Sequence, residues 1–354
     1  MRVTGNILMN SQLQAHITYC TEMLPRVSRT FAPTIRMLPR YLFMPVTVAY
    51  LLCRIADTVE DEPSLSKEEK QYNLALYAQM FSDPDLLAEF SHRVAFIPDH
   101  NQDVVLIKNL DRVMAVFKSF SMEVQRLIGI WVVEMVMGMK KFAQEKGKGK
   151  FHFLKSMKDL DEYTYYVAGT VGHLLTALFA HFSRTITPAV VQRLEKFSSS
   201  FGKGLQMVNI IRDINADLKR GQSYIPDEIL RKYNLTRKSI YDAENCIQAE
   251  QMFNELIEMA IGHLDNALAY VLNIPKEEAR IRLFCLLPMF WAMQTLKIIQ
   301  QNTLTLLRID SIKISRRTIR IEFLKALILM FSNRLTVHHY KKIRRNFAVQ
   351  AAVS

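Results

Sequence analysis

The chain has 354 residues, with 11 glycines, 11 prolines and a formal net charge of +12. This length can bury a large core in one or two domains. Strand-like alternation is hard to find, whereas apolar residues recur at i, i+3 and i+4, so the pattern excludes a strand-rich fold and predicts an all-α protein. The four cysteines form no C-x-x-C pair, and no segment resembles a signal peptide. These features indicate a reduced, cytoplasmic compartment.

The first predicted helices lie in the opening 61 residues. One covers about 11–25, with Ser11 as its N-cap, and the next covers about 42–61. A polar loop over 62–69 follows. Further helices are separated by breaks at 82–84, 98–101, 147–149 and 187–188.

Two of the predicted helices end on aspartates with D-x-x-x-D spacing. Asp57 and Asp61 form the first cluster; Asp213 and Asp217 form the second, on a helix that begins near Pro188 and runs through them. Residues i and i+4 share a helix face, so each pair directs two carboxylates to one side. Carboxylates near a helix C-terminus meet the negative end of its dipole. The clusters therefore predict nearby cations, and Mg²⁺ takes oxygen ligands of this kind.

An arginine precedes each cluster closely, Arg54 in one case and Arg212 in the other. One interpretation is a local ion pair on a solvated helix, which contributes little stability. The other is bidentate binding of a diphosphate by the guanidinium. Acidic pairs are common on helix faces, but two of them, each beside an arginine, favour the second interpretation. If the two helices face each other, Mg²⁺ could bridge their carboxylates to a diphosphate in a cavity.

The 21 residues of 163–183 contain no Asp, Glu, Lys or Arg. That length would suit a bilayer span. However, the segment also contains His173, His181 and several hydroxyl groups, which suit a buried central helix that faces a cavity better than they suit lipid. We predict the buried helix.

From Arg308 to the end, the chain has eleven Lys and Arg and two acids, a net charge of +9. A solvated helix face, a nucleic-acid surface and an anionic membrane surface are the three interpretations. No nucleic-acid-binding signature accompanies the charge. Apolar residues over 323–331 lie among the cations and favour an amphipathic helix on the core or on a membrane. The expected organisation is one helical domain over 1–354 with a basic extension from about 308, and no nucleic-acid partner.

Four segments resemble, in family order, motifs of the squalene and phytoene synthases. They are Ser28-Arg29-Thr30-Phe31-Ala32, the stretch from Tyr50 to Asp61, the stretch from Tyr165 to Gly172, and the stretch from Leu205 to Asp213 with Asp217. Together they span roughly residues 28–226. The resemblance implies an isoprenoid-synthase fold, in which a single helical bundle surrounds a central cavity.

Two later segments narrow the resemblance. Phe284-Cys285-Leu286-Leu287-Pro288 is similar to the F-C-x-x-P of squalene synthases, and the stretch from Ile312 to Arg317 resembles their basic NADPH-associated segment. This implies that two farnesyl diphosphates join into presqualene diphosphate, which NADPH then reduces to squalene. A non-reductive relative that makes presqualene diphosphate or phytoene is the alternative. A retired helical assembly factor is a third hypothesis, against which the intact acids and tyrosine argue.

The resemblance also implies a role for particular residues. The Mg²⁺ ligands would be Asp57, Glu60, Asp61, Asp213 and Asp217. The diphosphate contacts would be Ser28, Arg29, Arg54, Gln206, Asn209, Arg212 and Arg220. NADPH would contact Lys313, Arg316 and Arg317. Tyr166 would transfer a proton or steer a carbocation, and Phe31 and Phe284 would either present ring faces to carbocations or pack in the core.

One departure from the family pattern follows the second cluster. Bacterial relatives commonly read R-G-R-x-Y-[LI]-P there, and Gln222 stands in this chain where they have the second arginine. Either Arg220 compensates, or the affinity for one diphosphate is reduced. Because squalene is insoluble in water, we expect an enzyme that is peripheral to an anionic membrane. The sequence predicts no oligomeric state.

Overall fold

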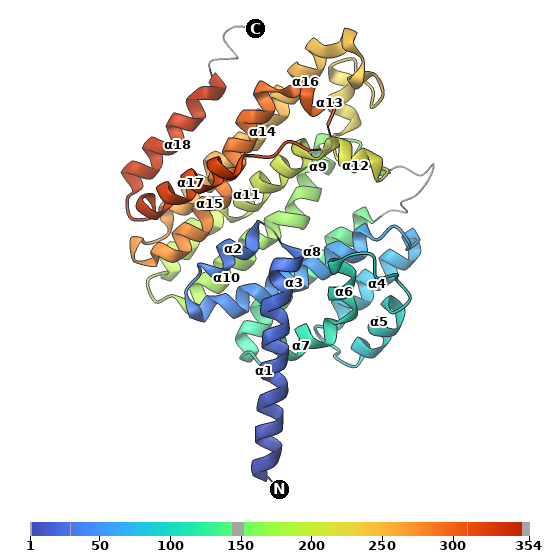
Figure 1. Ribbon diagram of the computed structural model, residues 1–354, viewed down its shortest axis with the longest axis vertical. Helices are drawn as coiled ribbons and strands as arrows, with labels where there is room; N and C mark the ends of the chain where they lie inside the picture. The colour runs from blue at the N-terminus through green and yellow to red at the C-terminus, as the bar shows by residue number, and fades with distance from the viewer. Residues whose placement is uncertain (1, 29, 144–151, 310, 349–354) are drawn as a thin grey trace. The chain divides into compact units, whose positions relative to one another are not determined.

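A computed structural model describes residues 2–28, 30–143, 152–309 and 311–348 of the chain (Figure 1). Over these residues the chain is helical, apart from β1 (His152–Phe153) and β2 (Gln222–Ser223), which pair in parallel. The all-α prediction is confirmed. The chain forms two compact units, unit 1 with Met1–Gln144 and Ala177–Phe182, and unit 2 with Glu145–Thr176 and Ser183–Ser354. That the whole chain acts as one domain stays a prediction.

Unit 1 is built around one apolar helix. Its helices are α1 (Arg2–Val27), α2 (Phe31–Arg36), α3 (Arg40–Asp61), α4 (Lys67–Gln79), α5 (Leu86–Val94), α6 (Gln102–Lys108), α7 (Leu110–Lys118) and α8 (Met122–Phe142). The central helix α3 packs against α1, α4, α6, α7 and α8. Leu51, Leu52 and Ile55 of α3 are fully buried, as expected for a helix that is apolar on most sides. The first cluster lies at the end of this helix.

The predicted helix at 42–61 is confirmed as α3, but the first helix differs from its prediction. Helix α1 begins at Arg2 rather than near residue 11, so Ser11 lies inside a helix and is not its N-cap. Ser66 and Glu69 form a reciprocal capping box that ends the predicted polar loop and begins α4. The predicted break at 147–149 lies outside the described residues.

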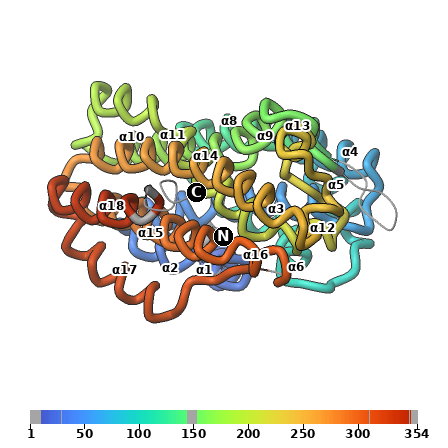
Figure 2. Tube along the Cα trace, turned by 90° about the horizontal axis from the view of Figure 1, so that it is seen from above, coloured from blue at the N-terminus to red at the C-terminus, as the bar shows by residue number. Residues whose placement is uncertain are grey.

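Unit 2 is centred on a long helix that carries the residues before the second cluster. Its elements are α9 (Met157–Thr164), a π-helix (Tyr165–Gly169), α10 (Thr170–Phe182, its end in unit 1), α11 (Pro188–Arg212), α12 (Ile214–Lys219), α13 (Asp227–Lys232), α14 (Cys246–Asn273), α15 (Ala279–Gln301), α16 (Thr303–Leu306), α17 (Arg316–Leu329) and α18 (Asn333–Ala348). Short 3₁₀ turns cover Ser239–Tyr241, Ala243–Asn245 and Lys276–Glu278. Helix α11 packs against the π-helix, α14 and α15. Figure 2 shows α17 on the outer side of α15.

The uncharged segment 163–183 is not a single α-helix, because the π-helix interrupts it. Its hydroxyl residues Thr164, Thr170 and Thr176 are buried, as predicted. The described helices that are long and apolar enough to cross a membrane are Arg40–Asp61 and Lys276–Gln301, and both are mostly buried within the protein. Length and composition alone are therefore weak evidence that either one spans a membrane.

Two glycines let helices in unit 2 touch at their backbones. A Cβ atom at Gly172 would lie 1.8 Å from the Ser198 carbonyl oxygen, and one at Gly202 would lie 1.9 Å from that of Ala168. No side chain fits at such distances, so glycine is required at both positions. The crossing holds the π-helix directly against α11.

A buried arginine joins the C-terminal helices. Arg282 is fully buried and donates hydrogen bonds to the carbonyl oxygens of Val271 (3.1 Å), Ile274 (2.8 Å) and Met330 (2.7 Å), and to Asn333 Oδ1 (2.6 Å). Burial lowers the pKa of Arg282, yet a guanidinium keeps its charge in proteins. These contacts fix the end of α14 and the turn between α17 and α18 to α15.

Replacing Gly172 with alanine is expected to destabilise the protein by about 3 kcal/mol or more, because the new methyl group would overlap the Ser198 carbonyl. The free energy of unfolding in urea measures this effect. Gly262→Ala is the matched control, since nothing lies within 4 Å of a Cβ atom there. Alanine is more favourable than glycine in a helix by about 1 kcal/mol, so this variant should be slightly more stable than the wild type. Equal behaviour of the two variants would contradict the backbone contact.

Candidate active site

The first cluster occupies the last turn of α3, as predicted. Glu62 then leaves the helix in an extended conformation, with φ −61° and ψ 115°. Asp61 is exposed and Asp57 is half-buried, whereas Glu60 is only 5% exposed. The two aspartates therefore reach the surface of unit 1, and Glu60 faces inward.

Arg54 lies between two carboxylates. Its Nη1 is 3.8 Å from Asp57 Oδ2, its Nε is 3.2 Å from Asp103 Oδ1, and its Nη2 donates to the Val27 carbonyl at 3.1 Å. Arg54 Nε and Asp103 Oδ1 form this ion pair without the alignment of a hydrogen bond, so neither atom has a hydrogen-bond partner. Arg54 thus has one well-formed bond and two looser ion pairs, an arrangement that leaves donors for an incoming anion.

Asp103 was not predicted from the sequence. It lies in the first turn of α6, which Asn101 caps by accepting a hydrogen bond from the Val104 amide at 2.8 Å. Burial raises the pKa of Asp103, and the Arg54 charge opposes that rise. For Arg54, burial opposes the charged form, but Tyr50 and the nearby carboxylates outweigh it and raise the pKa. In the sequence, Asp103 is an acid two residues after the N-cap Asn101. That local pattern does not predict a contact with Arg54.

The end of α1 gathers further predicted residues beside α3. Ser28 is 5% exposed, and its Oγ accepts a hydrogen bond from the Phe31 amide at 3.1 Å. Tyr50 donates to the Val27 carbonyl at 3.4 Å, and its ring lies 6.1 Å from that of Phe31. Burial raises the pKa of Tyr50. Arg29 lies outside the described residues.

The second cluster lies across a helix junction, not within one helix as predicted. Helix α11 ends at Arg212, and Asp213 is both its C-cap and the N-cap of α12, with φ −102° and ψ 15°. The Asp217 amide still donates to the Asp213 carbonyl at 2.9 Å, so the two residues keep the spacing of a helical turn. Arg212 binds the Asp213 carboxylate with both Nε (2.9 Å) and Nη2.

Asp217 and Arg220 form the next ion pair along the chain. The Asp217 side chain is 9% exposed, whereas that of Arg220 is 62% exposed, so the cation covers a buried acid. Gln222 is 1% exposed on β2 and lies opposite His152. Arg220 is therefore a second cation beside this cluster, in addition to Arg212.

Gln206 and Asn209 lie on α11 before the cluster, and Asn209 Nδ2 donates to Gln206 Oε1 at 3.5 Å. With Asp213 they follow i, i+3, i+7 spacing, so they lie along one helix face. Phe284 is buried in α15 at 4% exposure, beside the fully buried Cys285. This burial is compatible with both roles that the sequence suggested for Phe284, packing in the core and presenting a ring face.

Tyr166 lies in the π-helix. Its ring is 5.2 Å from that of Tyr165, and its carbonyl accepts a hydrogen bond from Thr170 Oγ1 at 2.7 Å. Tyr166 is half-buried. Single π turns occur often at functional sites, because they change the direction of the side chains within a helix. The sequence did not reveal this turn.

Asn215 lies inside the second cluster and was also missed. Its Nδ2 donates to the carbonyl oxygens of Leu306 (2.7 Å) and Ile309 (2.6 Å), and its Oδ1 accepts from the Tyr241 hydroxyl at 2.8 Å. Asn215 is 9% exposed. These bonds tie the cluster to the segment that leads toward Lys313. No local pattern announces such a contact, because its partners lie far away in sequence.

The predicted cofactor cations lie at the start of α17. Lys313, Arg316 and Arg317 are exposed. Ser315 is the N-cap and accepts a hydrogen bond from the Thr318 amide at 3.0 Å, which places both arginines in the first turn. That end of a helix is already positive. Two arginines there are unfavourable for the helix alone and favourable for a bound anion.

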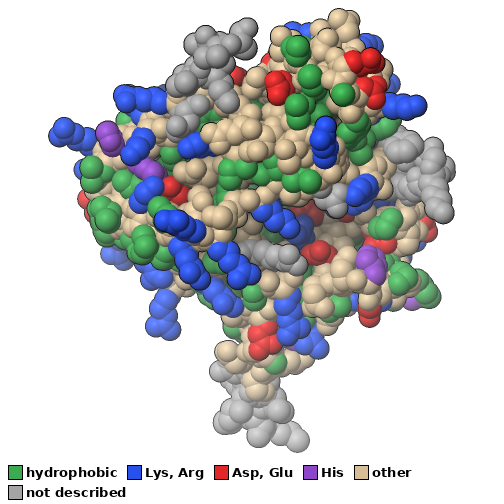
Figure 3. Space-filling model, turned by 45° about the horizontal axis from the view of Figure 1, so that its top comes forward, with side chains coloured by type: hydrophobic (Ala, Val, Ile, Leu, Met, Phe, Trp, Pro, Cys, Tyr) green, Lys and Arg blue, Asp and Glu red, His purple; other side chains and the backbone are tan. Residues whose placement is uncertain are grey.

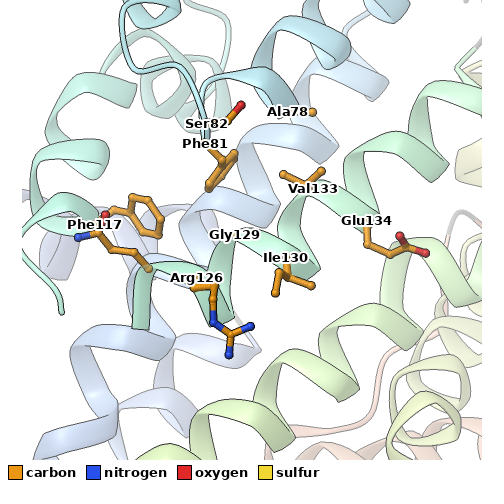
Figure 4. A pocket seen from close by; sticks show the side chains of 10 residues that line it. Ala78, Phe81, Ser82, Phe117, Arg126, Gly129, Ile130, Val133 and Glu134 are labelled. Atoms are coloured by element: carbon orange, nitrogen blue, oxygen red, sulfur yellow. The ribbon is translucent and has the colours of Figure 1, made fainter. Parts of the chain in front are cut away.

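No predicted site residue that the structure describes lines the pocket of about 600 Å³ in unit 1 (Figure 4). Phe81, Phe117 and Ile130 form its apolar wall, and Arg126 at its rim is paired with Glu123 at 2.8 Å. It carries no part of the predicted chemistry.

In the part of the chain that the structure describes, no group of three or more His, Cys, Asp or Glu is arranged to hold a metal ion. Each cluster instead supplies two carboxylates. Mg²⁺ is commonly bound through one or two carboxylates, several waters and substrate phosphates. The residues therefore fit a Mg²⁺ ion shared with a phosphate ligand, and they do not form an all-protein cage.

Comparison with known proteins identifies the class. A family model for squalene/phytoene synthases matches residues 24–318. The chain belongs to the squalene/phytoene synthase family, and the recognition made from its motifs is confirmed. The ligand complex of TcSQS has the same fold, with a TM-score of 0.80 at 23% identity over 95% of this chain and 92% of that one.

The similar curated proteins are squalene synthases. The chain is 30% identical to that of Eremothecium gossypii over 342 residues, which are 96% of this chain and 74% of the relative. It is 31% identical to squalene synthase 1 of Arabidopsis thaliana over 293 residues, which are 82% of this chain and 66% of the relative. The chain thus spans about two thirds to three quarters of the length of these relatives.

Replacing Asn215 with alanine is expected to destabilise the protein by about 2–3 kcal/mol, because two buried carbonyls and a hydroxyl lose their partner. Amide exchange should rise over 303–309 and stay unchanged in unit 1. Asn266→Ala is the control, since the exposed Asn266 makes a single bond to Ser200 at 3.2 Å. Unchanged exchange over 303–309 would show that Asn215 does not hold that segment.

Proposed function

We propose that the chain is a squalene synthase, a farnesyl-diphosphate farnesyltransferase. It joins two farnesyl diphosphates head to head into presqualene diphosphate and reduces this intermediate with NADPH to squalene. The observation that carries the proposal is an aspartate pair beside a half-buried arginine in each unit, in a chain 30% identical to a squalene synthase over 342 residues.

Arg54 and Arg212 bind the diphosphates. Their side chains are 33% and 31% exposed, so their charges are only partly screened by water. Each is paired with its own aspartate before substrate arrives. On binding, each guanidinium exchanges that carboxylate for diphosphate oxygens, which suit its planar donors. Further diphosphate contacts come from Ser28, Arg29, Gln206, Asn209 and Arg220.

The carboxylates of both clusters hold Mg²⁺. The ligands are Asp57, Asp61, Asp213 and Asp217, with Glu60 as a helper. Bound Mg²⁺ neutralises the negative charge that develops on the departing diphosphate. The location of the first cluster at the C-terminal end of α3 supports this role, because carboxylates there are unfavourable without a cation.

Aromatic residues handle the carbocations that follow. Phe31 is half-buried beside Tyr50 and presents a ring face, a contact that contributes up to about 2 kcal/mol when water is excluded. Phe284 does the same from α15. The Tyr166 hydroxyl holds or moves a proton, with a diphosphate oxygen as base.

Lys313, Arg316 and Arg317 bind the phosphates of NADPH. The support for this role is electrostatic, since all three side chains are exposed and the two arginines lie at the positive N-terminal end of α17. We further propose that the enzyme works in the cytoplasm at an anionic membrane, because its product is insoluble in water.

Product analysis tests this function. The purified chain would receive farnesyl diphosphate and Mg²⁺, with and without NADPH, and the products would be identified by mass spectrometry. We expect squalene with NADPH and presqualene diphosphate without it. Phytoene from a longer diphosphate, or presqualene diphosphate under both conditions, would identify a non-reductive relative. No consumption of any prenyl diphosphate would reject the function.

Asp57→Asn and Asp213→Asn are each expected to lower turnover about a hundredfold or more, because each removes a charged Mg²⁺ ligand. Stability without substrate should change by less than about 1 kcal/mol, since both ion pairs are partly exposed. Steady-state kinetics and urea unfolding measure the two effects. Glu123→Gln, at an exposed ion pair, is the control. Wild-type turnover in either variant would refute the metal assignment.

Converting Lys313, Arg316 and Arg317 together to alanine is expected to spare the first condensation and impair the second step. Only the second step needs NADPH, whose phosphates require cations. Farnesyl diphosphate should still be consumed, while presqualene diphosphate or non-reduced alcohols accumulate. Product ratios at limiting NADPH measure the change.

The matched control removes three exposed cations elsewhere, Lys118, Arg231 and Lys276. Its squalene yield should equal that of the wild type. If the triple variant at α17 also makes undiminished squalene at limiting NADPH, those cations form only a solvated face.

A further inference from the structure

The outer side of α17 presents a row of apolar side chains to solvent. This α17 face comprises Ile321, Leu324, Ile328, Phe331 and Leu335, which are 39%, 61%, 65%, 57% and 47% exposed. The first three follow i, i+3, i+7 spacing, so they form one stripe along the helix. The row continues through the turn after α17 into α18. Contiguous exposed apolar side chains of this kind mark an interaction surface.

The exposure of this face follows from how α17 packs. Glu322, Ala326 and Leu329 lie on the opposite side of the helix and are at most 7% exposed, and α17 contacts α15. Figure 2 shows α17 beside α15 with its other side uncovered by unit 2. Arg282 fixes the turn that carries Phe331, through its bonds to Met330 and Asn333. The turn at the end of α17, which carries Phe331, is therefore fixed to unit 2, and the exposure of the apolar row does not result from loose packing of this helix.

Cations without exposed acids surround the face. Arg316, Arg317, Arg320 and Arg334 are exposed, and none of them contacts a carboxylate among the described residues. Glu322 is the only acid over 311–348. Figure 3 shows Lys and Arg side chains interspersed with apolar ones on the side of the molecule where α17 and α18 lie.

Glu322 is withdrawn from this surface. Its side chain is 2% exposed and accepts from Lys325 Nζ at 3.0 Å and from His339 Nε2 at 2.7 Å. The single acid of the region thus serves the packing of α17 and α18. Within 311–348, the exposed charges beside the face are therefore all positive.

We propose that the α17 face docks on the surface of an anionic lipid bilayer. The helix lies in the plane of the interface, with Leu324, Ile328 and Phe331 at the boundary between headgroups and acyl chains. Arg320 and Arg334 bind the lipid phosphates, and the stems of such side chains follow the apolar surface. Arg316 and Arg317 also belong to the proposed NADPH contacts, but Arg320, Leu324, Ile328 and Arg334 have no part in the proposed reaction chemistry, so either proposal can fail alone.

Apart from Arg334 and Leu335 in its first turn, helix α18 does not form this surface, although it is strongly basic. Its apolar residues Tyr340, Ile343 and Phe347 are at most 4% exposed, and the Tyr340 hydroxyl donates to Asp265 at 2.7 Å. Arg344 pairs with Glu258 at 3.0 Å. The apolar side of α18 is therefore buried within the protein beyond its first turn, whereas α17 exposes apolar side chains along its length.

Charge complementarity selects lipid over a second copy of the chain. A two-fold interface through the α17 face would bring the same arginines of both copies together. An anionic bilayer instead offers phosphates to those arginines and an apolar layer to the row between them. The +9 charge from Arg308 onward acts in the same direction.

Vesicle flotation of the full chain tests the proposal. Vesicles of pure phosphatidylcholine are compared with vesicles containing about one third phosphatidylglycerol, the anionic lipid that attracts basic residues. Wild type is expected to bind the anionic vesicles, with binding that weakens in salt. Arg320→Gln with Arg334→Gln should weaken it about thirtyfold, at roughly fivefold for each charge. Leu324→Gln with Ile328→Gln should weaken it about tenfold or more.

The control pair is Met122→Gln with Ile247→Gln, two side chains that are 86% and 65% exposed in other parts of the chain. It should bind vesicles like the wild type. All variants should keep wild-type unfolding curves and wild-type turnover on detergent-dispersed substrate, because none of the changed residues is buried or part of the reaction site.

Three results would overturn the proposal. One is equal binding of wild type to neutral and anionic vesicles. Another is vesicle binding that neither substitution pair weakens. The last is absence of vesicle binding together with self-association in sedimentation that Leu324→Gln with Ile328→Gln abolishes, since the face would then be covered by a second copy.

Discussion

The electrostatic problem of placing carboxylates at helix ends shapes this protein. Asp61 completes the last turn of α3, with Asp57 one turn before it, and Asp213 ends α11 and begins α12. At the C-terminal end of α3 the helix dipole and the acids repel each other, by about 0.3–1 kcal/mol for a surface charge. Arg54 offsets that repulsion in the resting protein, and Arg212 pairs with Asp213 at the junction of α11 and α12. Under the proposed function, the same guanidiniums become donors for diphosphate once Mg²⁺ binds the carboxylates, so one pair of charges would serve both stability and binding.

Much of the fold could be predicted from the sequence because helix periodicity is a local property. The end of α3 was predicted correctly, since apolar spacing stops where Asp57 and Asp61 begin. The junction at Asp213 was missed, because the D-x-x-x-D spacing is kept across it and the Asp217 amide still bonds to the Asp213 carbonyl. Ser11 was wrongly read as an N-cap because serine is also tolerated inside a helix such as α1.

The residues that the sequence did not reveal act through distant partners. Asp103 meets Arg54 from another helix, and Asn215 reaches the carbonyls of Leu306 and Ile309. Neither contact leaves a local pattern, since pairing across long sequence separations depends on how helices pack. The same holds for the π-helix, which is held against α11 where Gly202 meets the backbone. Gly172 was visible as part of a motif and Gly202 was not, and the close approach that both permit was not predicted from either.

The basic C-terminal region shows why charge alone does not identify a surface. Over 311–348 the sequence has ten Lys and Arg and one acid, and the sequence pattern could not divide them between α17 and α18. Packing makes the division. Helix α18 turns its apolar side inward, whereas α17 buries Glu322 and leaves Leu324 and Ile328 in solvent. The positive charge around this row opposes self-association through it. On the docking proposal, the same charge gives the row an affinity for anionic lipid, so one distribution of arginines would serve both effects.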